Sequence, residues 1–305
     1  MPFPKGFKEV ARQEFAYFNF LRSVGRYLIP GYRETYEQAD YIFSGSAYTL
    51  DLIKDVFGVP DERVELLYEN GLSPTFIQDD EPLPVTPEAA ALDKTLSASK
   101  GPLNLLFVGR LVPYKGADML IDAVGRLKPS VRDNVRLSIV GYGSERADLE
   151  AQVRSLNLTE HINFIGWVQQ GETLDYYRDA DIFCFPSVRE FGGAVVLEAM
   201  GNGLPCIVVN NGDIGEYVSA ETGFSIDPQS RDFVVQQLTT SIEQLAENPG
   251  LRQRMGREAI ARAKSFAWDI RAQKVLSVYN HVLKLNDNTT ENVDVAEPAR
   301  TLVQV

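Results

Sequence analysis

The sequence of 305 residues predicts an α/β protein whose main part is a parallel β-sheet covered by helices on both faces. Between residues 103 and 226, short apolar runs alternate with segments in which apolar residues recur at helical spacing. The runs are almost continuously apolar, as is typical of strands that are buried on both faces. With 44% hydrophobic and 24% charged residues, the composition is that of an ordinary globular protein.

The apolar runs predict six strands, at residues 103–108, 135–140, 162–165, 182–185, 206–209 and 224–226. Each run is joined to the next by a helical segment, and such crossovers of about 30 residues place neighbouring strands parallel. Residues 101–227 are therefore expected to form a Rossmann-like domain. Three further helices are predicted, at residues 231–247, 251–265 and 268–285, with Asn248-Pro249-Gly250 as the first break.

The first 77 residues have a different pattern. Residues 1–28 carry one apolar helical face and predict an amphipathic helix. Two strand-like pieces follow, YIFSGS and VELLY, with a helix predicted at residues 47–58; two strands are too few for an independent sheet. The predicted organisation is a partial N-terminal domain at 1–77, a linker at 78–101, a complete domain at 102–267, a closing helix at 268–285 and a flexible tail at 286–305.

Composition also limits the functions to be considered. A net charge of −12 argues against a nucleic-acid partner, which requires a basic surface. The sequence has no apolar run of membrane-spanning length and no signal-peptide pattern, so the expected location is the cytoplasm. Cys184 and Cys206 lie in apolar runs and are expected to be buried strand residues. Aromatic and basic residues in the first 28 positions leave two interpretations open: contact with an anionic membrane surface, or packing within an N-terminal lobe.

The first candidate site is the segment VGRLVPYKG, in which a strand ends at Gly109 and a loop carries Arg110 and Lys115. In an open parallel sheet this loop lies at the carboxyl edge, where ligands bind. Two cations beside a helix N-terminus suit a diphosphate, and the alternative is a pair of solvated loop cations. The segment is not a P-loop, because Lys115 precedes Gly116 and no hydroxyl residue follows.

The second candidate is VGYGSER, again a strand followed by glycines and a helix. Arg146 stands where the third glycine of the dinucleotide-binding motif would be. An NAD-dependent oxidoreductase, which would bind nicotinamide through Gly141 and Gly143, is therefore the weaker alternative. Close approach of Gly141 to another ligand is the preferred interpretation.

The third candidate spans residues 185–209 and carries two glutamates, Glu190 and Glu198, with Gly192 and Gly193 between them. The glycines place Glu190 in a loop and Glu198 in the early turns of the following helix, both facing a cleft. Carboxylates accept hydrogen bonds from paired hydroxyls, so one glutamate would hold a sugar and the other a ribose. The glycines would expose backbone N–H groups to the ligand.

Asp179-Ala180-Asp181 matches the pattern of metal-dependent sugar transferases, but it lies just before a predicted strand. It therefore falls at the amino edge of the sheet, opposite the ligand side. We interpret it as helix-end charge. Ser46 and Ser187 lack the nucleophile-elbow pattern, so a serine hydrolase is not predicted.

Taken in order, the motifs resemble a known family. The segments GRLVPYKG, FIGWV, DADIFCFPSVREFGGAVVLEAMGNGLPCIVVNNGDIGEYV and ETGFSI resemble the C-terminal domain of the family 4 retaining glycosyltransferases of GT-B fold. The resemblance covers residues 104–285, and residues 39–77 resemble the end of the N-terminal domain. It implies a GT-B fold with one complete Rossmann-like C-terminal domain and the remnant of a second, N-terminal one.

The resemblance also implies site roles, with a nucleotide-diphosphate sugar as donor and neither a metal nor another cofactor. Arg110 and Lys115 would hold the diphosphate, and Glu198 the ribose. The catalytic centre would contain Glu190, which would hold the transferred sugar. The other residues implied at the donor site are Gly109, Gly141, Trp167, Val168, Phe191, Gly192, Gly193 and Ala194.

Retention is ascribed in this family to attack by the acceptor on the face that the diphosphate leaves, with that diphosphate acting as base. One local departure is that Phe191 follows Glu190 directly, whereas the family's aromatic residue usually stands two positions after the glutamate. The glycine-rich loop and acceptor site of the family's N-terminal domain have no counterpart in residues 1–77.

The predicted function is transfer of a sugar to a glycan, lipid or protein acceptor, with an N-terminal lobe that is either truncated in this sequence or supplied in trans by another chain. The alternative is a non-catalytic nucleotide-sugar-binding module or one subunit of a split transferase.

Overall fold

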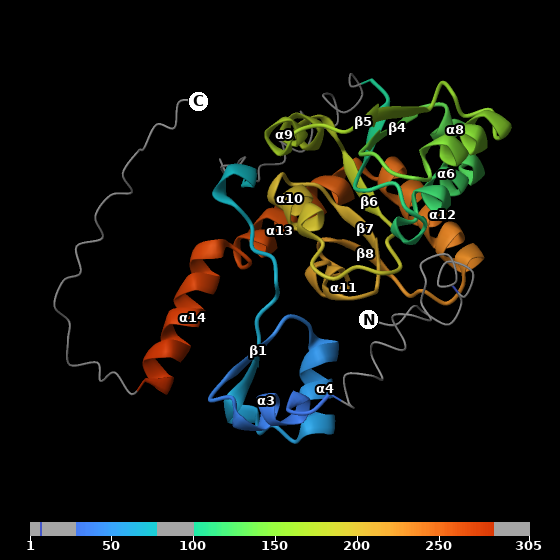
Figure 1. The fold of residues 1–305 in the computed structure, drawn as a ribbon. Helices are drawn as coiled ribbons and strands as arrows, with labels where there is room; N and C mark the ends of the chain where they lie inside the picture. The colour runs from blue at the N-terminus through green and yellow to red at the C-terminus, as the bar shows by residue number, and fades with distance from the viewer. Residues whose placement is uncertain (1–6, 8–28, 78–100, 284–305) are drawn as a thin grey trace, which may run out of the picture.

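A computed structural model describes residue 7 and residues 29–77 and 101–283 (Figure 1). Its main part is a six-stranded, fully parallel sheet in the order β5-β4-β3-β6-β7-β8. The strands are β3 (Leu103–Val108), β4 (Val135–Val140), β5 (Ile162–Gly166), β6 (Ile182–Phe185), β7 (Cys206–Val209) and β8 (Gly223–Ile226). The strand order reverses direction between β3 and β6, which is the position where ligands bind in open sheets. The predicted Rossmann-like α/β fold is confirmed.

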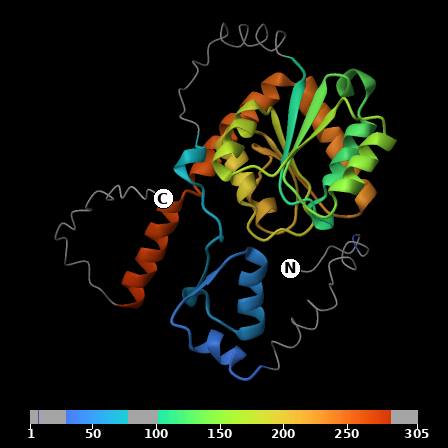
Figure 2. The same cartoon turned by 45° about the horizontal axis from the view of Figure 1, so that its top comes forward.

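Helices cover both faces of this sheet (Figure 2). Those within the sheet domain are α6 (Ala117–Arg126), α7 (Pro129–Arg132), α8 (Arg146–Ser155), α9 (Gln170–Asp179), α10 (Ala194–Gly201), α11 (Asp213–Tyr217), α12 (Arg231–Glu247) and α13 (Pro249–Lys264). Helix α6 packs against α8 and α12 on one side, and α10 packs against α13 on the other. Every residue of β6 and β7 is buried, which explains their continuously apolar sequences.

The N-terminal part is a small unit below the sheet domain in Figure 1. Its elements are α3 (Tyr32–Gln38), β1 (Ile42–Ser44), α4 (Ala47–Phe57), the short 3-10 helix η3 (Asp61–Arg63) and β2 (Val64–Leu66). The chain then runs up to the 3-10 helix η4 (Pro74–Phe76), which packs against α10 of the sheet domain. Strands β1 and β2 form a two-stranded parallel sheet with its own small apolar cluster. The predicted helix before residue 29, most of the predicted linker and the predicted tail lie outside the described residues.

The last helix, α14 (Trp268–Val282), leaves the sheet domain and runs beside the N-terminal part (Figures 1 and 2). Its Lys274 donates a hydrogen bond to the backbone oxygen of Leu66 at 3.1 Å and pairs with Glu65 at 2.7 Å. Helix α13 begins at Pro249, two residues earlier than expected. Proline fits the first position of a helix, because the backbone N–H that it lacks would have no partner within the helix there.

Burial confirms the interpretation of the cysteines, since Cys184 in β6 and Cys206 in β7 are both buried free thiols.

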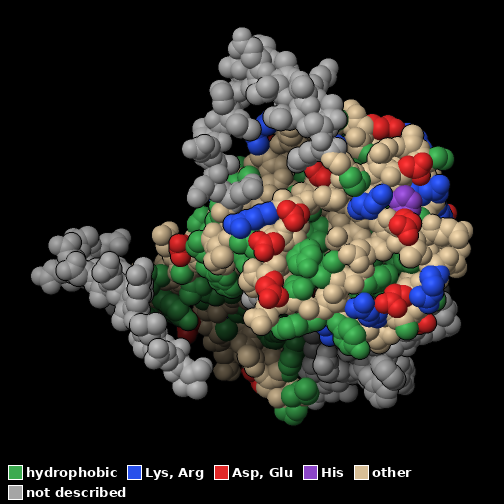
Figure 3. Space-filling model, turned by 90° about the horizontal axis from the view of Figure 1, so that it is seen from above, with side chains coloured by type: hydrophobic (Ala, Val, Ile, Leu, Met, Phe, Trp, Pro, Cys, Tyr) green, Lys and Arg blue, Asp and Glu red, His purple; other side chains and the backbone are tan. Residues whose placement is uncertain are grey.

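On the face shown in Figure 3, acidic and basic side chains are interspersed. None of the helices in the described ranges combines the length and apolar character that crossing a bilayer requires.

Candidate functional site

The loops that carry the three sequence motifs meet at the carboxyl edge of the sheet. The backbone N–H of Gly141, after β4, donates to the oxygen of Gly166, at the end of β5, at 2.7 Å. The N–H of Val188, after β6, donates to the oxygen of Tyr114, after β3, at 2.9 Å. Because all six strands are parallel, segments distant in sequence become neighbours at this one edge.

At the centre of this edge, the ammonium of Lys115 is hydrogen-bonded to the carboxylate of Glu190. Lys115 ends the 3-10 helix η5 (Pro113–Lys115), and Glu190 lies in the loop after β6. Both side chains are little more than one-tenth exposed, at 13% and 11%. The Lys115 ammonium also lies 5.0 Å from the centre of the Phe185 ring. The structure thus brings together two residues that the sequence assigned to different motifs.

Arg110 lies in the same loop as Lys115 but is exposed. Its guanidinium donates a hydrogen bond to the hydroxyl of Tyr114 at 2.5 Å. The two cations therefore differ: Lys115 is enclosed and paired, whereas Arg110 lies at the surface, where solvent screening weakens its field.

Glu198 occupies the second turn of α10, as expected, and is 9% exposed. The hydroxyl of Tyr177, from α9, donates a hydrogen bond to its Oε2 at 2.9 Å. Burial, and then the nearby Glu198 carboxylate, raise the pKa of Tyr177 well above its ordinary value. Tyr177 was not predicted, because a tyrosine inside an amphipathic helix carries no local sign of its partner in another helix.

Gly192 and Gly193 lie directly before α10, and Gly193 has a left-handed φ of 55°. A Cβ atom at Gly193 would come 2.1 Å from Cγ2 of Ile214 in α11. One at Gly192 would come 1.8 Å from Nδ2 of Asn70, in the segment that leaves the N-terminal part. Close packing and the left-handed φ are therefore sufficient reason for glycine at 193, whereas at 192 the Asn70 side chain could move aside. Gly193 also leaves the N-terminus of α10, at Ala194, without a side-chain cap.

Gly141 adopts a φ of 138°, and a Cβ atom there would lie 1.9 Å from the backbone oxygen of Gly109. The close approach of the neighbouring loop thus explains why this position requires glycine. The sequence interpretation, that a ligand approaches Gly141 closely, is not needed to explain the residue.

The rim of this edge carries exposed aromatic side chains in the loops after β5 and β6. Trp167 is 74% exposed, and Val168 beside it is partly buried. Phe191 is 53% exposed, and the Cζ atom of its ring lies 3.9 Å from the position that a Cβ atom added to Gly45, after β1, would occupy. The N-terminal part therefore approaches the loop that holds Glu190.

A buried carboxylate near this site was also missed. Asp213, the first residue of α11, is fully buried, and neither of its oxygens has a hydrogen-bond partner among the described residues. Burial, followed by the charges of Glu216 and Glu69, raises its pKa to about 7, and the charge of Arg271 opposes this shift. An acidic residue at the start of a helix is ordinary, so its sequence position did not reveal its burial.

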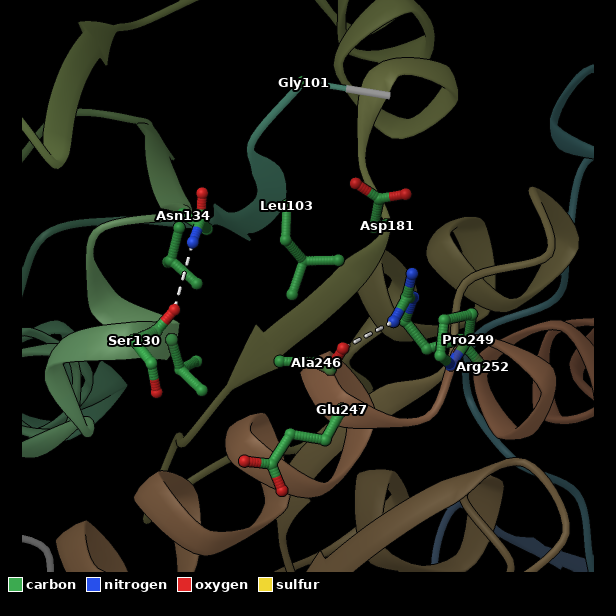
Figure 4. Close-up of a pocket in the computed structure, with 11 residues that line it drawn as sticks. Gly101, Leu103, Ser130, Asn134, Asp181, Ala246, Glu247, Pro249 and Arg252 are labelled. Carbon is green, nitrogen blue, oxygen red and sulfur yellow. Dashed lines mark hydrogen bonds between the residues drawn. The ribbon is translucent and has the colours of Figure 1, made fainter. Parts of the chain in front are cut away.

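The placement of Asp179-Ala180-Asp181 at the amino edge is confirmed. Asp181 accepts a hydrogen bond from the backbone N–H of Asn104 at 2.9 Å. A cavity of about 400 Å³ opens beside it, where Arg252 donates to the backbone oxygen of Ala246 (Figure 4). The first residues of β3 and β4 line this cavity, so it lies at the opposite edge from the predicted donor site.

Comparison with known proteins identifies the family. The sequence model of the family described as "Glycosyl transferases group 1" matches residues 90–262, more than half of the chain. The chain is 26% identical over 258 residues to the D-inositol 3-phosphate glycosyltransferase of Kribbella flavida, covering 82% of this chain and 58% of that protein. It is 33% identical over 181 residues to the glycogen synthase of Mycobacterium tuberculosis, covering 59% of this chain and 42% of that protein.

Solved structures show the same fold. Anabaena HepE in complex with UDP superposes with a TM-score of 0.63 at 21% identity, covering 80% of this chain and 64% of that one. WaaG, a glycosyltransferase involved in lipopolysaccharide biosynthesis, gives 0.62 at 22% identity, covering 89% and 72%. These neighbours confirm the GT-B fold. The chain spans about 60% of the length of the first curated relatives that it matches in sequence. The family model and the order of the motifs agree, and the chain belongs to the glycosyl transferases group 1 family.

Proposed function

We propose that this chain binds a nucleoside-diphosphate sugar at the carboxyl edge of its sheet, for transfer of the sugar to a glycan, lipid or protein acceptor. The observation that carries the proposal is the contact between Lys115 and Glu190 at the junction of β3 and β6. Lys115, which we propose as the cation for phosphate, lies beside Glu190, which we propose as the carboxylate for sugar hydroxyls, next to the topological switch point. The UDP complex of the structural neighbour HepE supports a nucleotide ligand.

The diphosphate is assigned to Lys115, Arg110 and the uncapped N-terminus of α10. Backbone N–H groups and the helix dipole at this terminus favour an anion. Two side-chain cations and a helix terminus together neutralise the charge that develops on the leaving diphosphate. This set performs the task without a metal ion, so transfer is proposed to be metal-independent.

The nucleoside is assigned to Glu198, which accepts hydrogen bonds from the ribose hydroxyls, and to the loops at Gly141 and Val168, which lie near the base. The transferred sugar is assigned to Glu190 and the backbone of residues 191–194. Because Lys115 touches Glu190, diphosphate and sugar then lie side by side.

In the proposed reaction an acceptor hydroxyl attacks the anomeric carbon on the face from which the diphosphate leaves. The bond from this carbon to the phosphate oxygen breaks, and a bond to the acceptor oxygen forms. The acceptor proton passes to the departing diphosphate, and the anomeric configuration is retained. The side chains and backbone groups of the protein orient the reactants and supply charge, and none of them acts as a nucleophile.

Calorimetric titration with uridine, guanosine and adenosine diphosphates and their glucose conjugates tests the donor site. We expect one nucleotide to bind, and Arg110→Ala and Lys115→Ala each to weaken binding about 10-fold, because each removes a charge-assisted contact. Lys128→Ala is the control, since Lys128 pairs with Glu247 beside the opposite cavity. Failure of the wild type to bind, or unchanged binding in both variants, refutes the site.

A second function is favoured by the N-terminal part, whose described residues contain only the two strands β1 and β2. Such a chain would be a nucleotide-sugar-binding module or one subunit of a split transferase. Donor turnover, measured with and without a separately expressed N-terminal lobe of a group 1 relative, separates the two. Binding without turnover in every combination identifies the module, and turnover identifies the transferase.

A further inference from the structure

The hydrogen bond between Tyr177 and Glu198 joins two helices on the same side of the sheet. Tyr177 is completely buried, and its hydroxyl donates to Oε2 of a carboxylate that is itself 9% exposed. A carboxylate offers about four lone-pair positions, so it can accept a hydrogen bond from a tyrosine and others from a diol. The Tyr177 bond therefore helps to set the direction of this carboxylate.

The phenol ring has little freedom to move. It contacts Phe183 of β6 at a centroid distance of 5.9 Å and Phe76 of η4 at 6.1 Å, the latter edge-on. Aromatic contacts of this kind fix both the ring and the direction of its O–H group. The raised pKa of Tyr177 keeps the hydroxyl protonated, so it acts as a permanent donor.

The helix that carries Glu198 is held from the same side. The Nδ2 atom of Asn202 donates to the backbone oxygen of Glu198 at 2.9 Å and to that of Phe76 at 3.1 Å. Phe76 thus contacts both the ring that orients the carboxylate and the side chain that caps its turn. The Glu198 side chain and its backbone are thus both bonded to this buried arrangement.

We infer that Tyr177 is the positioning residue for ribose recognition: its hydroxyl holds the Glu198 carboxylate in the direction in which it accepts the 2′- and 3′-hydroxyls of the nucleotide. This inference rests on the proposed function of Glu198. It goes further by making recognition of the ribose depend on a residue that does not touch the ligand. Loss of the hydroxyl removes a bond that holds the carboxylate in this direction, so ribose contacts weaken while phosphate contacts persist.

The test compares a nucleoside diphosphate with its 2′,3′-dideoxy analogue, by calorimetry, for the nucleotide among uridine, guanosine and adenosine diphosphates that the wild type binds best. Tyr177→Phe removes only the hydroxyl oxygen. We expect it to weaken the ribonucleotide about 10-fold and the dideoxy analogue less than about 2-fold, which corresponds to the loss of one hydrogen bond to a charged group.

Tyr217→Phe is the matched control, because Tyr217 is equally buried and its hydroxyl has no hydrogen-bond partner among the described residues. We expect both ligands to bind it as they bind the wild type. Equal weakening of both ligands by Tyr177→Phe, or no weakening of either, overturns the inference.

Glu198→Gln separates this inference from the proposed function. If the wild type does not prefer the ribonucleotide, or Glu198→Gln keeps the preference, the assignment of Glu198 fails. If Glu198→Gln abolishes the preference and Tyr177→Phe keeps it, only the role of Tyr177 fails. Should Tyr177→Phe not fold, Phe76→Leu replaces it, because it removes the edge-on contact that fixes the Tyr177 ring. A smaller preference for the ribonucleotide in Phe76→Leu supports the inference, and an unchanged preference contradicts it.

Discussion

Lys115 and Glu190, 75 positions apart in the sequence, form an ion pair between the loop after β3 and the loop after β6. The pair is possible because β3 and β6 are adjacent in the sheet. Its two charges are mostly shielded from water, so each depends on the other for stabilisation. In the proposed complex, the diphosphate and the sugar hydroxyls provide new partners for both.

This pair leads to a stability prediction for the free protein. Lys115→Met or Glu190→Gln alone is expected to lower the free energy of unfolding by about 2 to 4 kcal/mol, because one enclosed charge loses its partner. The double variant is expected to lose less free energy of unfolding than the two single variants added together, by at least about 1 kcal/mol. Urea titration measures all three, with Glu37→Gln in the exposed pair with Arg33 as control. A double variant that equals the sum contradicts the prediction.

Asp213 predicts a dependence of stability on pH. Its pKa is about 7 in the folded protein, above the ordinary value of 3.8, because it is buried near Glu216 and Glu69. The folded state therefore keeps this proton between pH 4 and 7, where the unfolded chain has lost it. The contribution of Asp213 to the free energy of unfolding is fully present below pH 4 and is lost as the pH rises to about 7. The free energy of unfolding falls over this range by at most about 1.4 kcal/mol per pH unit.

Asp213→Asn removes this titration, so the variant is expected to gain stability relative to the wild type between pH 5 and pH 8. Urea titration at both values measures the change. Asp148→Asn, at an exposed aspartate in the first turn of α8, is the control. If the difference in free energy of unfolding between the wild type and Asp213→Asn stays constant with pH, Asp213 does not titrate in this range.

The glycines of the structure allow a paired test of backbone strain. Gly193→Ala is expected to destabilise the protein by about 2 kcal/mol or more, because alanine would be strained at φ 55° and would clash with Ile214. Gly171→Ala, in α9, meets no atom within 4 Å and is expected to be neutral or to stabilise by about 0.5 kcal/mol. Thermal unfolding distinguishes them, and equal melting temperatures for both variants would argue against the strain.

Asn202 provides a prediction for the contact between η4 and α10. Asn202→Ala leaves the buried backbone oxygen of Phe76 without this donor and is expected to cost about 1 to 3 kcal/mol of unfolding free energy. Asn134→Ala breaks an exposed bond to the oxygen of Ser130, for which less than about 0.5 kcal/mol is expected. Urea titration compares the two, and an equal loss would show that burial of the bond is unimportant.

The sheet and the position of the candidate site followed from the sequence. Apolar runs separated by helical segments specify parallel βα units, and such units place every strand-to-helix loop at one edge. That reasoning put Arg110, Lys115 and Glu190 on the carboxyl edge and Asp181 on the amino edge, as the structure has them. The glycines at 141, 192 and 193 were also recognised as special, and packing against neighbouring segments accounts for Gly141 and Gly193.

The partners of the buried polar groups were decided only by the tertiary structure. Hydrophobic periodicity states which side of a helix is buried, but not which residue of another element lies opposite. Tyr177 meets Glu198 because α9 and α10 lie on the same face of the sheet, and Asp213 lies near Arg271 because the first turn of α14 is close to α11. The sequence alone thus determined the fold and the edge on which the chemistry lies. The packing of several elements at once decided which side chains orient the carboxylates there.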